Sequence, residues 1–264
     1  MPAASRISDF QALKGQRKIV CLTAYTAPIA SAIDPYCDLM LVGDSVGMVV
    51  YGMEDTRDVS SEMMCAHGKA VMRRRSHALV VIDLPFGSYE NSPEQALETA
   101  RHILAETGAD AVKLEGGAEM AQTVAILRAH DIEVMGHVGL LPQTAEQMRV
   151  TGRTEPAAQA LKNDIRALED AGVFSIVIEA VIEPVAAELA SACAVPTIGI
   201  GASAACDGQI LVTDDMLGLY DRRSPKFVRQ FASVADRIDS AARAYRSAVI
   251  SGEFPAPDEL YQDS

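Results

Sequence analysis

Four acidic residues each stand at the end of an apolar run. Asp44 follows LMLVG and Asp83 ends LVVID, while Glu115 follows AVKL and Glu179 ends SIVIE. One such acid is commonly only the N-cap of the next helix. Four that meet at one edge would repel one another unless a cation neutralised them. Carboxylate oxygens are hard ligands that favour Mg²⁺ or a similar ion, so the pattern predicts a functional cluster that binds a divalent metal.

Lys113 and Glu115 extend this cluster. They stand two residues apart, so in a β-strand they share one face and Leu114 lies on the other. Burying a lysine and a glutamate is costly unless something binds them, and we therefore expect both to face a binding site. His137, in VMGHVGL, is a weaker candidate for the same site, because a histidine in an apolar run is more often a hydrogen-bonded core residue.

Strand-like and helical segments alternate along the chain. Apolar runs typical of buried strands cover 19–24, 38–43, 78–83, 109–115, 132–137, 173–179, 195–200 and, more weakly, 209–213. Helices are predicted at 93–107, 155–172, 183–193 and 225–250, and an exposed tail at 252–264. In the clearest helix, Ser92 is the expected N-cap, Pro93 the first helical residue, Gln95 the partner in a capping box, and Gly108 the stop.

This alternation predicts parallel strands with right-handed crossovers. Near-continuous apolar runs are typical of strands buried on both faces. About eight such units in 264 residues indicate a (β/α)8 TIM barrel, forming a single domain over 1–264 with a helical C-terminal region and a short exposed tail. An open doubly wound sheet is the alternative, but no G-x-G-x-x-G motif opens the first helix. Active sites of such barrels lie at the carboxyl ends of the strands, where the four acids would all lie.

Composition narrows the classes of partner. The net charge of -13 argues against nucleic acid, whose phosphates require a basic surface. The five cysteines form no C-x-x-C pair and are odd in number, which favours free thiols in a reducing compartment. The first residues lack the apolar core of a signal peptide, and no apolar run is long enough to span a bilayer. We therefore expect a cytoplasmic protein that binds neither nucleic acid nor membrane.

Six longer motifs carry a resemblance to a known family. MLVGDSVGMVVYG, DLPFGSY, VKLEGG, GHVGLLPQ, IVIEAV and IGIGASAACDGQILVTDDMLGL, in this order, are similar to the ketopantoate hydroxymethyltransferases from about residue 5 to about residue 255. The resemblance implies a (β/α)8 barrel of the phosphoenolpyruvate mutase/isocitrate lyase superfamily. It also implies transfer of a hydroxymethyl group from the co-substrate 5,10-methylenetetrahydrofolate to 3-methyl-2-oxobutanoate, the first step of pantothenate biosynthesis. One Mg²⁺ per subunit and a homodecamer are further implications.

The resemblance also implies roles for individual residues. Asp44 and Asp83 would bind Mg²⁺, with Glu115 completing the metal shell directly or through water. Asp44, Asp83, Ser45 and Lys113 would bind the 2-oxo acid, Ser45 and Lys113 through its carboxylate.

Glu179 would be the general base. A cation bound by the ketone and carboxylate of the substrate acidifies the adjacent C3–H, and a nearby carboxylate can then remove that proton. The resulting enolate attacks the methylene carbon supplied by the folate. This chemistry needs no protein nucleophile, and the sequence shows no Ser-His-Asp or Cys-His signature.

Two segments depart from the family pattern, and two other functions stay open. DTRDVS at 55–60 and TAEQMRVTGR at 144–153 differ from the usual family sequences. One alternative is another Mg²⁺-dependent 2-oxo acid C–C lyase of the same superfamily, whose expected mark is a reactive cysteine in a K-x-C-G-H-type loop; none of the five cysteines lies in one. The other is a barrel that only binds or scaffolds, against which the retained acids and Lys113 argue.

Overall fold

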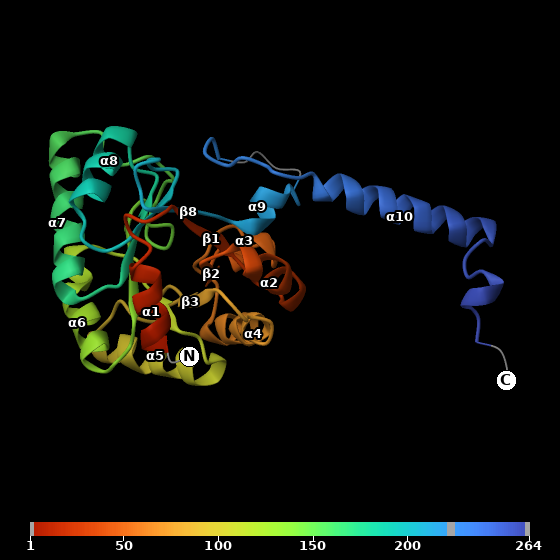
Figure 1. The fold of residues 1–264 in the computed structure, drawn as a ribbon, viewed down its shortest axis with the longest axis horizontal. Helices are drawn as coiled ribbons and strands as arrows, with labels where there is room; N and C mark the ends of the chain where they lie inside the picture. Colours follow the sequence, from red (N-terminus) through yellow and green to blue (C-terminus); the bar gives the residue numbers. More distant parts are fainter. Residues whose placement is uncertain (1–2, 221–224, 262–264) are drawn as a thin grey trace. The chain divides into compact units, whose positions relative to one another are not determined.

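The computed structural model describes residues 3–220 and 225–261. Eight parallel strands close into a barrel in sequence order, because the last strand pairs with the first (Figure 1). The strands are β1 (Ile19–Thr23), β2 (Leu39–Val42), β3 (Leu79–Asp83), β4 (Ala111–Lys113), β5 (Val134–Gly139), β6 (Ser175–Glu179), β7 (Thr197–Ile200) and β8 (Gly208–Leu211). The prediction of a (β/α)8 barrel is confirmed, and the open sheet is excluded.

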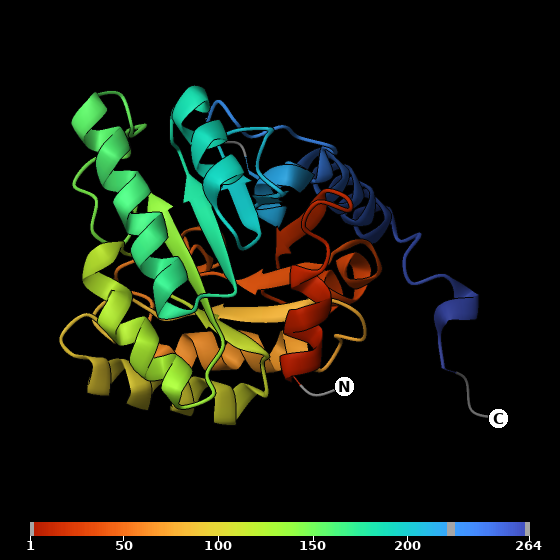
Figure 2. The same ribbon diagram turned by 60° about the vertical axis from the view of Figure 1, so that its left-hand side comes forward.

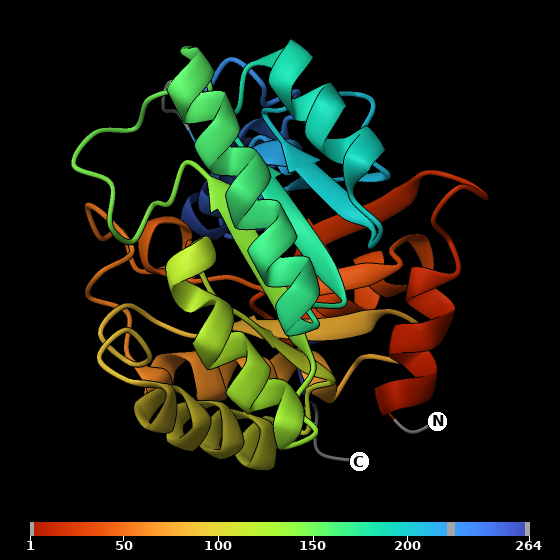
Figure 3. The same ribbon diagram turned by 90° about the vertical axis from the view of Figure 1, so that its left-hand side faces the viewer.

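Helices surround the barrel. They are α1 (Ala3–Gln11), α2 (Ala27–Ile33), α3 (Val46–Val49), α4 (Ser61–Met72), α5 (Pro93–Thr107), α6 (Ala121–Ala129), α7 (Glu155–Ala171) and α8 (Glu183–Ala192), with short 3-10 helices at Asp34–Tyr36 and Ala118–Met120. Successive helices from α4 to α8 pack against one another, and Figure 3 shows α5 to α8 side by side over the strands.

The predicted start of α5 is confirmed only in part. The Ser92 hydroxyl accepts a hydrogen bond from the Gln95 backbone N–H at 3.2 Å, and Gly108 ends the helix in the left-handed conformation. The reciprocal half of the capping box is absent, since the Gln95 side-chain oxygen accepts from the Asn91 N–H instead. The Gln95 amide also donates to the Gly87 carbonyl, so its side chain is held by the preceding loop.

Helix α1 packs at the end of the barrel where the strands begin. Ile7 and Phe10 of α1 belong to the apolar cluster that fills the barrel. The Phe10 ring meets Phe174, just before β6, edge-on with centroids 5.9 Å apart. In Figure 2 the arrowheads of β2 and β3 point away from α1 (red). Each such buried side chain stabilises the fold by about 1.5–3 kcal/mol. Because these side chains fill the end where the strands begin, α1 closes the barrel opposite the expected active site.

Alternation along the strands links the apolar interior to the other rim. Leu79 and Val81 of β3 lie in the barrel core, and so does Ala111 of β4. Since side chains two apart share a face, Asp83 continues the inward series of β3 and Lys113 that of β4. The same strand geometry that buries the core therefore delivers charged groups to the carboxyl ends of the strands.

Residues 213–264 form a second compact unit. It contains α9 (Thr213–Leu217), α10 (Val234–Ser251) and a 3-10 helix at Pro257–Glu259. The prediction of a helix at 225–250 was wrong over 225–233. There the Phe231 N–H donates to the Met216 carbonyl of α9 instead of to a carbonyl one helical turn earlier, and the backbone is not helical. The predicted tail is largely exposed over 252–261, and 262–264 lie outside the described residues. A single domain over 1–264 stays a prediction.

Candidate active site

Asp83 and Lys113 form a buried ion pair at the carboxyl end of the barrel. They are register partners on β3 and β4, which places both side chains on one face. The Lys113 Nζ lies 2.7 Å from Asp83 Oδ1, with side chains 5% and 3% exposed. Burial favours the neutral amine, but the charges of Asp83, Glu115 and Asp44 outweigh it and raise the pKa of Lys113. Lys113 is therefore a fixed positive charge within the site.

Asp44 lies beside this pair. Its backbone N–H donates to Asp83 Oδ2 at 3.1 Å, so the end of β2 is tied to the end of β3. Burial and the charge of Asp83 raise the pKa of Asp44 to about 7. Next in sequence, the Ser45 hydroxyl lies 2.7 Å from the hydroxyl of Tyr25, which is buried. Burial and the neighbouring acid thus disfavour the charged form of Asp44.

Glu115 faces two other groups of the site. Its Oε2 accepts the Gln143 backbone N–H at 3.1 Å, and its Oε1 lies 3.4 Å from Nδ1 of His137. Burial would raise the pKa of Glu115, but His137, Lys113 and the Gln143 N–H outweigh burial and lower it. Glu115 is thus held ionised between the Gln143 N–H and His137.

His137 lies between two carboxylates. Its Nδ1 is 3.4 Å from Glu115 and its Nε2 is 3.3 Å from Glu179. Neither contact has hydrogen-bond geometry. Burial and Lys113 lower the pKa of His137, but the two carboxylates outweigh them and raise it to about 9. A protonated imidazole cannot accept a proton, so the ring acts at neutral pH as a cation between Glu115 and Glu179.

Glu179 is the most accessible of these acids. Its side chain is 16% exposed at the end of β6. The neighbouring backbone is unusual: Ala180 has a positive φ of 47°, a conformation that costs about 1 kcal/mol or more in a non-glycine residue. A Cβ at Gly139 would lie 2.2 Å from the Glu179 carbonyl oxygen. Glycine at 139 therefore allows β5 to approach β6 closely where Glu179 leaves the strand.

Two residues without a predicted role belong to the same cluster. Gln143, 1% exposed, donates its side-chain amide to Asp44 Oδ2 at 2.9 Å. Tyr89, also 1% exposed, lies with its hydroxyl 2.5 Å from the Gln143 side-chain oxygen. Both stand in motifs quoted above, GHVGLLPQ and DLPFGSY. A polar residue that ends an apolar loop motif is the signal that could have identified them.

The donor chemistry fits a divalent cation. The cluster contains four carboxylates and two cationic groups, so full ionisation leaves two negative charges: Asp44, Asp83, Glu115 and Glu179 against Lys113 and His137. Among the residues that the structure describes, no three His, Cys, Asp or Glu side chains are gathered to hold a metal by themselves. Mg²⁺ commonly takes only one or two carboxylates and completes its shell with water and substrate oxygens. Asp44 and Asp83, which adjoin each other, fit that mode.

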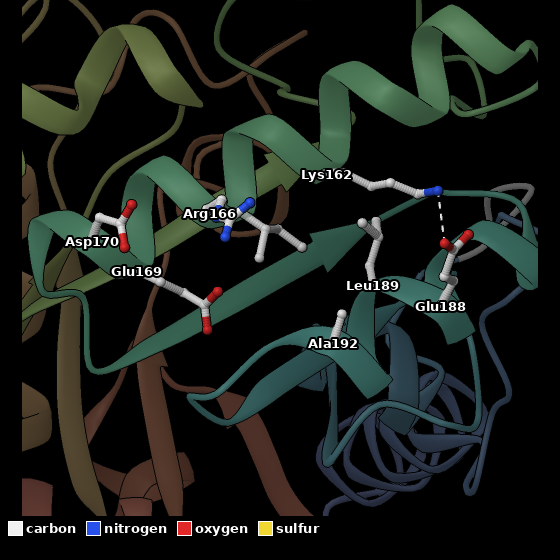
Figure 4. A pocket seen from close by; sticks show the side chains of 8 residues that line it. Lys162, Arg166, Glu169, Asp170, Glu188, Leu189 and Ala192 are labelled. Atoms are coloured by element: carbon white, nitrogen blue, oxygen red, sulfur yellow. Dashed lines mark ion pairs between the residues drawn. The ribbon is translucent and has the colours of Figure 1, made fainter.

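A separate pocket of about 390 Å³ lies on the outside of the barrel between α7 and α8 (Figure 4). Lys162 of α7 and Glu188 of α8 form an ion pair of 2.7 Å across it. Its charged lining includes Arg166 and Asp170 and contains none of the acids at the strand ends. This pocket is therefore not part of the candidate active site.

In the described parts of the chain, no helix has the length and apolar character needed to cross a membrane.

This chain is a closed (β/α)8 barrel, and acids, a lysine and a histidine gather at the carboxyl ends of its strands. That arrangement is typical of barrel enzymes. The family model of ketopantoate hydroxymethyltransferase matches residues 4–257. The chain belongs to the ketopantoate hydroxymethyltransferase family and is therefore an enzyme, a transferase.

Curated relatives agree with this membership. The 3-methyl-2-oxobutanoate hydroxymethyltransferase of Rhizobium rhizogenes is 53% identical over 97% of this chain and 94% of its own length. That of Brucella canis is 52% identical over 95% of this chain and 92% of its own length.

Solved structures share the fold at low identity. A 2,3-dimethylmalate lyase, described as a PEP mutase/isocitrate lyase superfamily member, has a TM-score of 0.62 at 14% identity, covering 99% of this chain and 89% of its own. A phosphonopyruvate hydrolase, solved in complex with oxalate and Mg²⁺, has a TM-score of 0.64 at 13% identity, covering 99% of this chain and 92% of its own.

Proposed function

We propose that the protein transfers a hydroxymethyl group from 5,10-methylenetetrahydrofolate to 3-methyl-2-oxobutanoate, giving ketopantoate and tetrahydrofolate. This is the first step of pantothenate biosynthesis. The observation that carries the proposal is the buried cluster at the strand ends, in which the acids and Lys113 of the family motifs adjoin one another. The membership of the family and the relatives named above support the same reaction.

One Mg²⁺ per subunit is part of this proposal. Asp44 and Asp83 would hold the ion. Glu115 would complete the shell directly or through water, because one of its two carboxylate oxygens, Oε2, is already engaged by the Gln143 N–H. Bound there, the ion supplies a Lewis acid that stabilises negative charge on the ketone oxygen of the substrate. The raised pKa of Asp44, caused first by burial and next by Asp83, supports a cation at this place.

The substrate carboxylate would be held by Lys113 and Ser45. Lys113 Nζ has three N–H donors, of which one bonds Asp83. Ser45 lies within 2.7 Å of the Tyr25 hydroxyl, so one of the two oxygens can donate to the other while the Ser45 side chain stays oriented. A charge-assisted bond from Lys113 to the carboxylate would fix the orientation of the 2-oxo acid.

Glu179 would remove the proton from C3 of the substrate. Its carboxylate is partly exposed, in contrast to the buried acids, and can therefore face a bound molecule. The positive charge of His137, 3.3 Å away, would orient the carboxylate. The proton passes to Glu179, and the enolate forms a C–C bond to the methylene carbon of the folate. The C–N bonds between that carbon and the folate nitrogens break, and water supplies the hydroxyl group and the protons that complete ketopantoate and tetrahydrofolate.

The segment 144–153, which departs from the family pattern, borders this site. The Thr151 N–H donates to the Ala180 carbonyl at 2.8 Å, next to Glu179 in sequence. Met148 and Val150 are exposed apolar side chains, 56% and 41%. From this position and these exposed apolar side chains we propose that the segment contacts the folate.

A turnover assay separates this function from the two alternatives. Purified protein is given 3-methyl-2-oxobutanoate and methylenetetrahydrofolate, and ketopantoate is measured before chelation, after chelation, and after Mg²⁺ is returned. We expect turnover that chelation abolishes and Mg²⁺ restores. Cleavage of a 2-oxo acid C–C bond without ketopantoate formation would indicate the lyase, and binding without turnover would indicate a barrel that has lost catalysis. Full activity in metal-free protein would contradict the proposed role of Asp44 and Asp83.

We also propose that the protein self-associates, with a homodecamer as the expected assembly, and that it is cytoplasmic. Helix α10 contains no buried residue, and it exposes Ile238, Tyr245, Val249 and Ile250. Exposed apolar side chains at helical spacing support a contact with another surface. Sedimentation of the full chain tests the assembly, and a monomer at micromolar concentration would contradict it.

The cysteines are buried free thiols, which supports a reducing compartment and therefore the proposed cytoplasmic location.

A further inference from the structure

We infer that Gln143 is a positioning residue for the metal-binding acids. It orients Asp44 through its side-chain amide and Glu115 through its backbone N–H. This inference rests on the proposed function, in which these acids bind the cation.

Gln143 connects the loop after β5 to three neighbouring strand ends. Its Nε2 donates to Asp44 Oδ2 at 2.9 Å and to the Leu84 carbonyl at 3.0 Å, and its Oε1 lies 2.5 Å from the Tyr89 hydroxyl. Its backbone N–H donates to Glu115 Oε2 at 3.1 Å. Asp44 follows β2, Leu84 and Tyr89 follow β3, and Glu115 follows β4. Through its side chain and its backbone N–H, Gln143 thereby joins the loop after β5 to the loops after β2, β3 and β4.

The partners determine which way the amide points. The Leu84 carbonyl can only accept, so the NH₂ group of Gln143 must face it, and the oxygen must face Tyr89. The Tyr89 hydroxyl has two acceptors, the Gln143 oxygen at 2.5 Å and the Glu115 carbonyl at 3.3 Å, and its proton points to the closer Gln143 oxygen. The same hydroxyl accepts the Glu115 backbone N–H at 3.2 Å. With both amide protons engaged, the donor to Asp44 is fixed in place before any ligand binds.

This arrangement has a consequence for the cation site. One oxygen of Asp44 is committed to Gln143, which leaves Oδ1 for a metal or substrate. One oxygen of Glu115 is likewise committed to the Gln143 backbone. Partners of this kind, which orient a ligand without touching the metal, typically contribute 10–100-fold to metal affinity. Gln143 would contribute by holding Asp44 in one rotamer.

The test measures binding of Mn²⁺ as a paramagnetic substitute for Mg²⁺, with 3-methyl-2-oxobutanoate present. The free-ion signal in electron paramagnetic resonance gives the affinity for wild-type protein, Gln143→Ala and Tyr89→Phe. Ser175→Ala is the matched control, because Ser175 is also fully buried and donates to a carbonyl, that of Pro196, but lies at the start of β6. Circular dichroism melting shows that each variant is folded.

We expect Gln143→Ala to weaken Mn²⁺ binding by about 10–100-fold. Tyr89→Phe, which keeps the bond to Asp44 but frees the amide to turn, should weaken it by a smaller factor, and Ser175→Ala should leave it unchanged. If Gln143→Ala fails to fold, Tyr89→Phe alone decides: wild-type affinity there overturns the inference. Wild-type affinity in folded Gln143→Ala overturns it as well, while the proposed function stands. Wild-type protein that binds no Mn²⁺ overturns the proposed metal site and this inference together.

Discussion

Replacing Glu179 by glutamine separates proton transfer from binding. The substitution keeps the size of the side chain and one hydrogen-bonding oxygen but removes the ability to accept a proton. Asp44, Asp83 and Lys113 make no contact with Glu179 among the described hydrogen bonds and ion pairs, so Mg²⁺ and the 2-oxo acid should still bind.

The expected loss of rate follows from the chemistry of a general base. Such a group contributes about 10²–10⁴-fold, equivalent to about 2.7–5.5 kcal/mol in the barrier. His137 should not replace Glu179, since Glu115 still faces its Nδ1. A unit charge 3.3 Å away interacts by about 5 kcal/mol at an effective dielectric of about 20. Partial solvation of Glu179 reduces this figure, and we expect the loss of this charge to lower the pKa of His137 from about 9.

The assay is exchange of the C3 hydrogen of 3-methyl-2-oxobutanoate for deuterium in heavy water, followed by proton NMR. Wild-type protein with Mg²⁺ should exchange it, and Glu179→Gln should do so about 10²–10⁴-fold more slowly. The matched control is Glu106→Gln, because Glu106 is an exposed acid near the end of α5 that pairs with Lys69 and lies outside the site. Exchange by Glu179→Gln at the wild-type rate would refute the role of Glu179, and another group of the site would then be the base.

Lys113→Met should lower the free energy of unfolding by about 3–5 kcal/mol, because it leaves the buried Asp83 without its counter-ion, and should weaken binding of 3-methyl-2-oxobutanoate. Denaturation and calorimetry measure the two effects, and unchanged substrate affinity in the folded variant would make Lys113 a structural counter-ion only. At Asp34, burial would raise the carboxyl pKa, but the Ser76 hydroxyl and the N–H groups of Ser76, His77 and Ala78 outweigh burial and lower it. A lowered folded pKa gives stability that is present above the unfolded pKa of about 3.9 and lost as pH falls through the folded pKa. The urea midpoint of wild-type protein should therefore fall more steeply across that acid range than the midpoint of Asp34→Asn, and equal slopes would count against this role of Asp34.

The strands and their charged ends were predictable from local pattern. Apolar runs bounded by turn residues predicted all eight strands. The strands β2 to β7 contain no exposed residue, and burial on both faces leaves a signal in consecutive residues. The period of two placed Lys113 and Glu115 on one face, and the parallel barrel placed the ends of its strands at one rim. These inferences depend on geometry that repeats from residue to residue.

Contacts made by irregular segments were decided only by the tertiary structure. Gln143 and Asp44 are 99 residues apart, and their bond depends on the path of the loop after β5, which no periodicity describes. The charge of His137 depends on carboxylates from two other strand ends that enclose it. The segment 225–233 has a helical pattern, yet the bond from the Phe231 N–H to the Met216 carbonyl takes the backbone out of a helix. In each of these cases the interaction that decides the conformation or the charge involves a partner distant in sequence. The local sequence pattern therefore determined the helices and strands, and the packing of the loops determined which side chains meet in the site.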